Sequence, residues 1–147
     1  MCLKAKDFST GGVMKIKQTT KDIVCYKVVR YCAPGAADYP MYWTPFEDVI
    51  IPMDVIKGET PFKPAYQGLW EGRSMGFFGP GAIHSVKDLK HAILIKNWCA
   101  TKFCPGYMEF KVFQCHIPES SYYIEGVDDW GGEGYASDAL VFDSEVA

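Results

Sequence analysis

The chain has little of what marks several common classes of protein. It contains no run close to the roughly 18 consecutive apolar residues that a membrane-spanning helix needs. Its first residues, Met1 to Asp7, include no apolar stretch like that of a secretory signal peptide. Internal repeats, low-complexity segments and a recognisable catalytic motif are missing as well. We therefore expect a cytoplasmic protein that has no membrane among its partners.

Positive charge is absent from the end of the chain. No Lys or Arg follows Lys111, although eight acidic residues do. Residues 1–30 show the reverse bias, with seven basic and two acidic residues. The two ends can pair within the fold or stay solvated. Because nucleic-acid binding requires a basic face and the net charge of the chain is −3, a nucleic-acid partner is not expected.

Cysteine is present six times. Six cysteines would suit three disulfides in an oxidising compartment, but the lack of a signal peptide predicts reduced thiols that pack as small apolar side chains. Cys99 and Cys104, completed by a histidine, have a spacing that zinc could use. Cys115 and His116 cannot both join such a site, because neighbouring strand residues point to opposite faces. We expect no metal and no cofactor, and zinc at Cys99 and Cys104 is the alternative.

The 147 residues are enough for one domain. Residues 1–20 are polar and rich in lysine, and Gly11 and Gly12 interrupt them, so we expect a flexible basic arm. Residues 21–147 are expected to form a single α+β domain. Its strands are predicted at residues 22–32, 107–117 and 139–142, with edge pieces over residues 47–57, where Pro52 interrupts the ladder. The predicted fold is a small, mainly antiparallel sheet with one principal helix and long loops.

That helix is expected at about residues 86–98. Ser85 would be its N-cap, and Asp88 would complete a near capping box. The helix would end near Trp98. The side chains of its apolar stripe share helical spacing and would face the core: Leu89, Ala92, Ile93 and Ile95.

The last third of the chain is rich in glycine and aromatic residues. Two strand-like runs, residues 117–126 and 134–138, flank a loop that contains Trp130. Asp128, Asp129 and Glu133 place three carboxylates within six residues of this loop, which would suit a hard cation. Their spacing is not that of a calcium-binding hand, which alternates its acids and ends on a distal bidentate Glu. We therefore expect a solvated hairpin tip.

We expect a binding site between the loop over residues 70–84 and the loop over residues 122–135. Aromatic side chains there offer large rigid surfaces for stacking. Ser85 opens the predicted helix soon after Gly79 and Gly81, and the N–H groups of a helix N-terminus can accept an anion such as the phosphate of a small molecule. The alternative is a tight turn beside a structural His84. The candidate ligand-binding residues are Trp70, Arg73, Phe77, Phe78, His84, Ser85, Trp130 and Tyr135.

The order of several segments is similar to that of a known group. These segments are the strand-like run at residues 22–29, Thr44-Pro45-Phe46, residues 82–85, residues 117–126 and Tyr135-Ala136-Ser137-Asp138. Over residues 22–143 the chain resembles small uncharacterised proteins of gut Bacteroidales and their phages. This resemblance implies a relative and a phage or mobile-element context, and it implies no activity.

A looser similarity is to the ADP-ribosyltransferase fold, a compact split β architecture that clamps NAD. That family has an Arg or His on its first strand, a second motif with Ser or Tyr, and a late catalytic Glu. Here Tyr26-Lys27 stands at the first position, which departs from the family. The resemblance would assign the second motif to Ser120-Ser121 or Tyr122-Tyr123 and the catalytic role to Glu125.

From these features we expect a binding module that performs no chemistry and that takes a protein partner or a phosphorylated small molecule. The first alternative is an ADP-ribosyl or other nucleotide-processing enzyme in which Glu125 is the key acid. The second alternative is a structural or virion-associated protein that uses its aromatic loops as an assembly interface.

Overall fold

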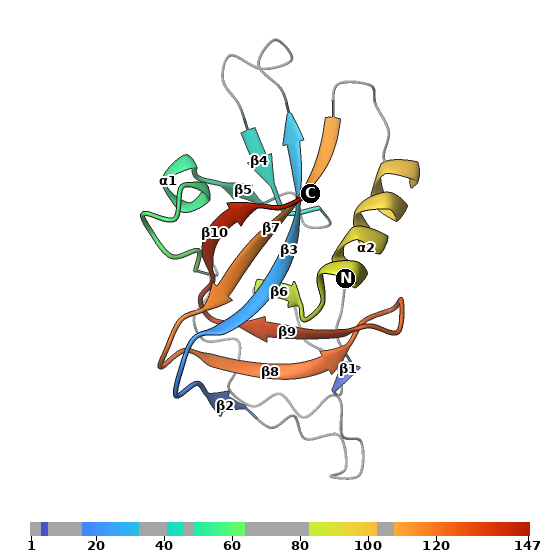
Figure 1. The fold of residues 1–147 in the computed structure, drawn as a ribbon. Coiled ribbons are helices and arrows are strands. Elements are labelled where there is room, and N and C mark those ends of the chain that lie inside the picture. The colour runs from blue at the N-terminus through green and yellow to red at the C-terminus, as the bar shows by residue number, and fades with distance from the viewer. Residues whose placement is uncertain (1–3, 6–15, 33–40, 46–48, 64–82, 103–107) are drawn as a thin grey trace.

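The computed structural model describes residues 4–5, 16–32, 41–45, 49–63, 83–102 and 108–147 (Figure 1). Most of these residues belong to one antiparallel sheet, and one main helix lies against it. The elements are β1 (Lys4–Ala5), β2 (Lys17–Gln18), β3 (Ile23–Cys32), β4 (Met41–Trp43), β5 (Ile50–Ile51), α1 (Met53–Ile56), β6 (Ile83–Val86), α2 (Leu89–Lys102), β7 (Met108–Ile117), β8 (Tyr122–Val127), β9 (Glu133–Ser137) and β10 (Val141–Glu145).

The long strands β3 and β7 form the centre of the sheet. They pair over their whole length, from Ile23 opposite Ile117 to Cys32 opposite Met108. β7 pairs with β10 on its other side, while β3 pairs with β6 near its start and with β4 near its end. From β6 the sheet continues through β9 to β8, which also pairs with β1 and β2. Both central strands lie where the runs of β-branched and aromatic residues predict them.

The alternation of side chains along the strands gives the sheet two apolar faces. On the helix-side face, α2 packs its buried residues against β3, β6 and β7. This cluster contains Val28, Val86, Ala92, Ile95, Cys99, Phe110 and Val112. On the opposite face, α1, β5 and β10 cover β3 and β7. This second cluster contains Cys25, Val29, Ile51, Val55, Phe62, Ile83, Phe113, Cys115, Ile117, Tyr135, Leu140 and Phe142.

The expected α+β fold is confirmed in its coarse form, a mainly antiparallel sheet with one main helix, although the chain contains more strand than we expected. The helix prediction was wrong at both ends. Ser85 lies in β6, and the carboxylate of Asp88 accepts a hydrogen bond from the N–H of Lys90 at 3.2 Å. The helix continues past Trp98 to Lys102. Ala92 and Ile95 are buried as predicted, whereas Ile93 is exposed.

Pro52 ends the short edge strand β5 and lies at the N-cap of α1, so the second edge piece expected there is a helical turn. The last strand begins at Val141 and extends to Glu145, beyond the end that the sequence indicates. Within residues 1–20, β1 and β2 pair with β8, and Thr19 is buried. These short segments therefore belong to the sheet. In the part of the chain that the structure describes, no helix has the length and apolar character that crossing a membrane requires.

Candidate polar site

Four polar side chains follow one another across neighbouring strands of the sheet. Glu125 of β8 is opposite Tyr135 of β9, and Tyr135 is opposite Ser85 of β6. Tyr26 of β3 pairs with Val86 of β6, and the antiparallel direction then places Lys27 alongside Ser85. We name Lys27, Ser85, Tyr135 and Glu125 the polar row.

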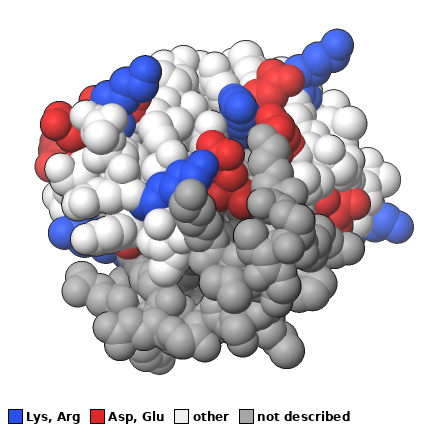
Figure 2. Space-filling model, turned by 90° about the horizontal axis from the view of Figure 1, so that it is seen from below, with Lys and Arg blue, Asp and Glu red and all other residues white. Residues whose placement is uncertain are grey.

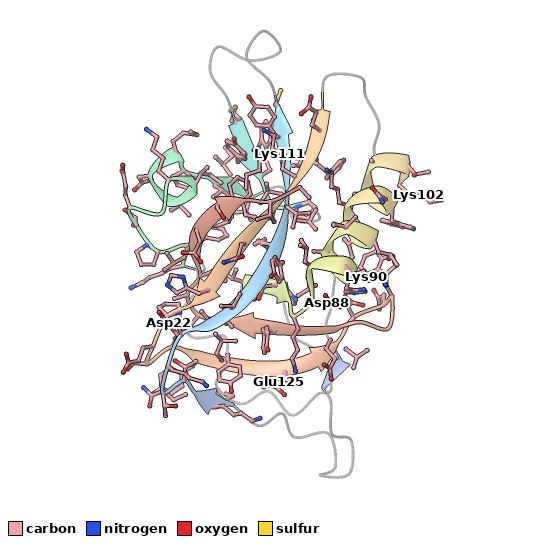
Figure 3. All side chains as sticks on the ribbon, in the orientation of Figure 1. Asp22, Asp88, Lys90, Lys102, Lys111 and Glu125 are labelled. Atoms are coloured by element: carbon pink, nitrogen blue, oxygen red, sulfur yellow. The ribbon has the colours of Figure 1, made fainter. Side chains whose placement is uncertain are left out.

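The polar row runs from the interior of the protein to its surface. Lys27, Ser85 and Tyr135 are 7%, 2% and 5% exposed. The side chain of Glu125 is 31% exposed, and its carboxylate lies 4.0 Å from Nζ of Lys17. In Figure 3, Glu125 is seen on β8 at the lower end of the molecule. Burying polar groups is costly unless they find partners, so a buried lysine and serine inside an apolar cluster indicate a specific role.

The interior end of the row holds hydrogen-bond donors. Nζ of Lys27 donates to the backbone carbonyl of His84 at 2.7 Å. Burial, followed by the nearby carboxylate of Glu125, raises the pKa of Tyr135 to about 12. The phenol of Tyr135 therefore keeps its proton at neutral pH and can donate it to an acceptor.

The surface end of the row is rimmed by further polar and aromatic groups. Glu133 lies on the same strand face as Tyr135, and its carboxylate is 3.5 Å from Nζ of Lys87. The rings of Tyr123 and Tyr135 meet edge to face, with centroids 6.0 Å apart. On the face of the molecule seen in Figure 2, basic and acidic side chains lie next to each other, so neither sign of charge dominates there.

The structure separates the residues that the sequence assigned to one site. Ser85 and Tyr135 are neighbours on the opposite face, in the polar row. Trp130 packs on the helix-side cluster, where its ring meets that of Trp98 with centroids 5.2 Å apart. His84 is one residue from Ser85 in β6, so its side chain points to the helix side as well. Four further candidates, Trp70, Arg73, Phe77 and Phe78, lie outside the residues that the structure describes.

His84 and Ser85 also lack the properties that an anion site at a helix N-terminus would need. Burial, followed by the charge of Lys27, lowers the pKa of His84 to about 3. Its imidazole is therefore neutral at neutral pH and supplies no positive charge. Ser85 is inside a strand, and α2 starts only at Leu89. Residues 84–85 therefore do not form the helix N-terminus that the sequence predicted there.

Sequence reasoning missed Lys27 and Glu133 as members of this region. The signal for Lys27 was present, because it stands between Cys25 and Val29 on one face of a strongly apolar strand. A lysine in such a position must either disrupt the strand or serve a buried role. Glu133 was assigned to a loop, and the structure places it at the start of β9.

The tip of the β8–β9 hairpin exposes Asp129, Gly131 and Glu133, as a solvated tip predicts, but Asp128 is buried beneath it. The side chain of Asp128 is fully buried and lies 2.6 Å from Nε2 of His91 in α2. Its other carboxylate oxygen accepts the N–H groups of Trp130 and Gly132 at 2.9 and 3.0 Å. Both oxygens are thus engaged within the protein, which argues against the cation alternative for this loop. We name the contact between His91, Asp128 and Gly132 the hairpin clamp.

No group of three or more His, Cys, Asp or Glu side chains is arranged to hold a metal ion within the described part of the chain. Cys99 is buried in the helix-side cluster, and Cys104 lies outside the described residues. Cys115 is buried on the opposite face, while His116 contacts Asp143 at 2.9 Å near the surface. The structure thus separates Cys115 from His116, as their places in a strand predict.

Comparison of the chain with models of protein families, with curated proteins and with solved structures gives no match.

Proposed function

We propose that this chain binds a small phosphorylated molecule at the polar row and performs no chemistry on it. The observation that carries the proposal is the continuous row of Lys27, Ser85, Tyr135 and Glu125, which reaches from a buried ammonium group to an exposed carboxylate. A ligand would enter at the surface end, beside Glu125, Glu133 and Lys87, whose side chains are between 31% and 50% exposed.

The donors of the row suit a phosphate group. An ammonium group, a hydroxyl and a protonated phenol all donate, and the oxygens of a phosphate ester are mainly deprotonated acceptors at neutral pH. The rings of Tyr123 and Tyr135 add a rigid surface on which a planar group can pack. The exposed carboxylates at the rim can accept hydrogen bonds from sugar hydroxyls. A nucleotide carries all three kinds of group, so it is the class of ligand that these residues fit best.

Calorimetric titration with AMP, ADP and inorganic phosphate tests this function. Tyr135→Phe removes one donor and keeps the ring, so we expect it to weaken nucleotide binding about tenfold, which corresponds to about 1.4 kcal/mol. The matched control is Tyr122→Phe in β8. The side chain of Tyr122 is exposed and, because strand residues alternate in direction, it lies on the face of the sheet opposite to Tyr135. Absence of binding by all three compounds, or equal losses in the two variants, contradicts the proposal.

A second candidate function is the transfer or hydrolysis of ADP-ribose from NAD. One observation favours it: β3, β6, β9 and β8 are successive neighbours in the sheet, so Lys27, Ser85, Glu133 and Glu125 lie on one face of it. The resemblance to ADP-ribosyltransferases requires a first-strand residue, a Ser or Tyr and a late Glu in one site. In this arrangement Ser85 takes the second position in place of Ser120-Ser121, and a carboxylate stabilises positive charge that develops on the ribose.

Incubation with NAD separates the two functions. An enzyme releases nicotinamide, which chromatography detects, and Glu125→Gln or Glu133→Gln reduces that release at least a hundredfold. Glu119→Gln is the matched control, because Glu119 is exposed in the turn before β8. A chain that binds NAD and returns it unchanged supports the binding function. Release of nicotinamide that neither glutamine variant slows contradicts the enzymatic candidate.

A further inference from the structure

The outer side of α2 exposes large apolar side chains that the core does not use. The inner side of the helix buries Ala92, Ile95 and Cys99 against the sheet. On the outer side, Leu94 is 49% exposed and Trp98, one helical turn later, is 37% exposed. Ile93 beside them is 36% exposed. Residues four apart in a helix lie on the same side, so these residues form one patch, which we name the outer patch.

The charges along α2 are all of one sign. Lys90, Lys96 and Lys102 belong to the helix, and it contains no Asp or Glu between Leu89 and Lys102. Figure 3 shows Lys90 and Lys102 near the two ends of the helix. The acidic residues closest in sequence are Asp88 at the N-cap and Glu109 in β7, while Asp129 lies in the hairpin tip, where its neighbour Trp130 meets Trp98. Because Lys90, Leu94, Trp98 and Lys102 are each four residues apart, the outer patch is apolar in the middle and has a lysine at each end.

The apolar side chains and the lysines of the outer patch together restrict the kind of partner that it can bind. A nucleic acid would neutralise the lysines but would offer nothing to Ile93 and Leu94. A second copy of α2 would offer apolar surface but would bring lysines towards lysines. An anionic lipid surface satisfies both needs, because headgroups attract lysine while the interfacial region accepts leucine and tryptophan. Figure 1 shows α2 at one side of the molecule, beside the sheet.

The sequence led us to expect no membrane partner, but the outer patch favours one: we propose that α2 docks this protein on an anionic lipid bilayer through this patch, without any described helix crossing the membrane. The inference is independent of ligand binding at the polar row, which lies across β3, β6, β9 and β8 on the other face of the sheet. Lys90 and Lys102, which are exposed and share a side of the helix with Leu94, would approach the headgroups, and Leu94 would enter the interface.

Co-sedimentation of the full chain with vesicles tests the proposal. We expect binding to vesicles of phosphatidylcholine with about 30% phosphatidylserine, weak binding to phosphatidylcholine alone, and release at high salt. The variant Lys90→Gln/Lys102→Gln should lower the partition coefficient more than tenfold, at about fivefold for each lysine. Leu94→Gln should lower it severalfold, because the side chain is exposed and its loss leaves the core intact.

The matched controls come from the other end of the sheet. Ile50→Gln replaces an apolar residue that is 55% exposed in β5, and Lys57→Gln removes an exposed lysine after α1. Neither should change vesicle binding. Failure to bind anionic vesicles overturns the proposal, and so does binding that Leu94→Gln and the double lysine variant leave unchanged. Capture of a synthetic helical peptide with alternating Glu and Leu faces, without vesicle binding, assigns the outer patch to an acidic protein and equally overturns it.

Discussion

Buried charges in this protein are compensated by groups that are distant in the sequence. The carboxylate of Asp128 meets the imidazole of His91, and the ammonium group of Lys27 meets the carbonyl of His84. Each contact joins two different elements of the fold. The sequence could indicate that Lys27 is buried, but it could not identify either partner, because each contact joins residues that are far apart in the chain.

The hairpin clamp depends on the absence of a side chain at residue 132. A Cβ there would overlap the ring of His91, whereas a Cβ at Gly131 has open space around it. We expect Gly132→Ala to move His91 away from Asp128 and to lower the free energy of unfolding by about 3 kcal/mol. Gly131→Ala should lower the free energy of unfolding by about 1 kcal/mol. Residue 131 has a φ of 80°, so an alanine there meets only the strain of a left-handed backbone conformation.

Urea unfolding followed by tryptophan fluorescence measures both changes, since Trp98 and Trp130 adjoin the hairpin clamp. Equal losses in the two alanine variants would show that the His91 ring does not limit the space at residue 132.

His84 predicts how stability depends on pH. Its pKa is about 3 in the folded protein and has the ordinary value of 6.5 when the chain unfolds. Below pH 6.5 the imidazole of His84 therefore binds a proton in the unfolded chain, whereas in the folded protein it stays neutral down to about pH 3. We expect His84 to lower the free energy of unfolding by up to about 1.4 kcal/mol for each pH unit as the pH falls through this window.

The measurement is urea unfolding between pH 7 and pH 4 for the native chain and for His84→Gln. The variant should show a shallower decline with falling pH. Burial raises the pKa of Asp138, which contributes to the pH dependence with the opposite sign. Because this contribution is present in both proteins, it cancels when their slopes of unfolding free energy against pH are compared. Parallel slopes in the two proteins would contradict the assignment to His84.

At the scale of elements, the sequence predicted whether a segment is a helix or a strand better than it predicted the residues at which the element begins and ends. β3 and β7 were predicted correctly because their long apolar and β-branched runs have no competing pattern. The start of α2 was misplaced because Ser85 has the chemistry of a cap, but pairing of β6 with β9 extends residues 83–86 as a strand. Tertiary pairing here outweighed local propensity.

Asp88 is the residue that begins α2 in the structure. Its side chain accepts the N–H of Lys90, so Asp88→Ala should lower the free energy of unfolding by about 1 kcal/mol. Asp88→Asn keeps an oxygen at the cap and should stay within about 0.5 kcal/mol of the native chain. Guanidinium unfolding followed by helical circular dichroism compares them. A loss of equal size in both variants would point to the charge of Asp88 and away from capping.

At the scale of the whole molecule, the sequence predicted the mainly antiparallel sheet but not the order of its strands. That order decides which side chains meet: it brings Ser85 next to Tyr135 and Lys27, whereas the side chains of His84 and Trp130 lie on the other face of the sheet. The expected site mixed two faces of one sheet because neighbouring residues in a strand are close in sequence and opposite in space. Pairings such as β6 with β9 join segments far apart in the chain, and local patterns contain no information on them.

All four cysteines that the structure describes are buried, three of them in the two clusters. Cys25, Cys32, Cys99 and Cys115 are buried, and burial raises the pKa of Cys25 to about 12 and that of Cys99 to about 11. Burial also raises the pKa of Cys115, and because the thiolate is the reactive form, the thiols of Cys25, Cys99 and Cys115 should resist iodoacetamide at pH 8 until the protein unfolds in urea. Mass spectrometry of the peptides locates the label. An exposed thiol introduced by Ser144→Cys should react at once, and equally fast labelling of Cys25 in the folded protein would contradict the burial.

The pairing of β3 with β7 has a consequence for how the chain acquires its structure. The first long strand has no long partner until residues 108–117 have been synthesised, since Ile23 pairs with Ile117 and Cys32 with Met108. Both hydrophobic clusters contain residues of β3 and β7, so neither cluster can form before these two strands pair. Folding dominated by such distant contacts takes milliseconds to seconds. During synthesis on the ribosome, the apolar side chains of β3 therefore stay exposed until β7 has emerged. In this interval we expect the nascent chain to be most prone to aggregation and to chaperone binding.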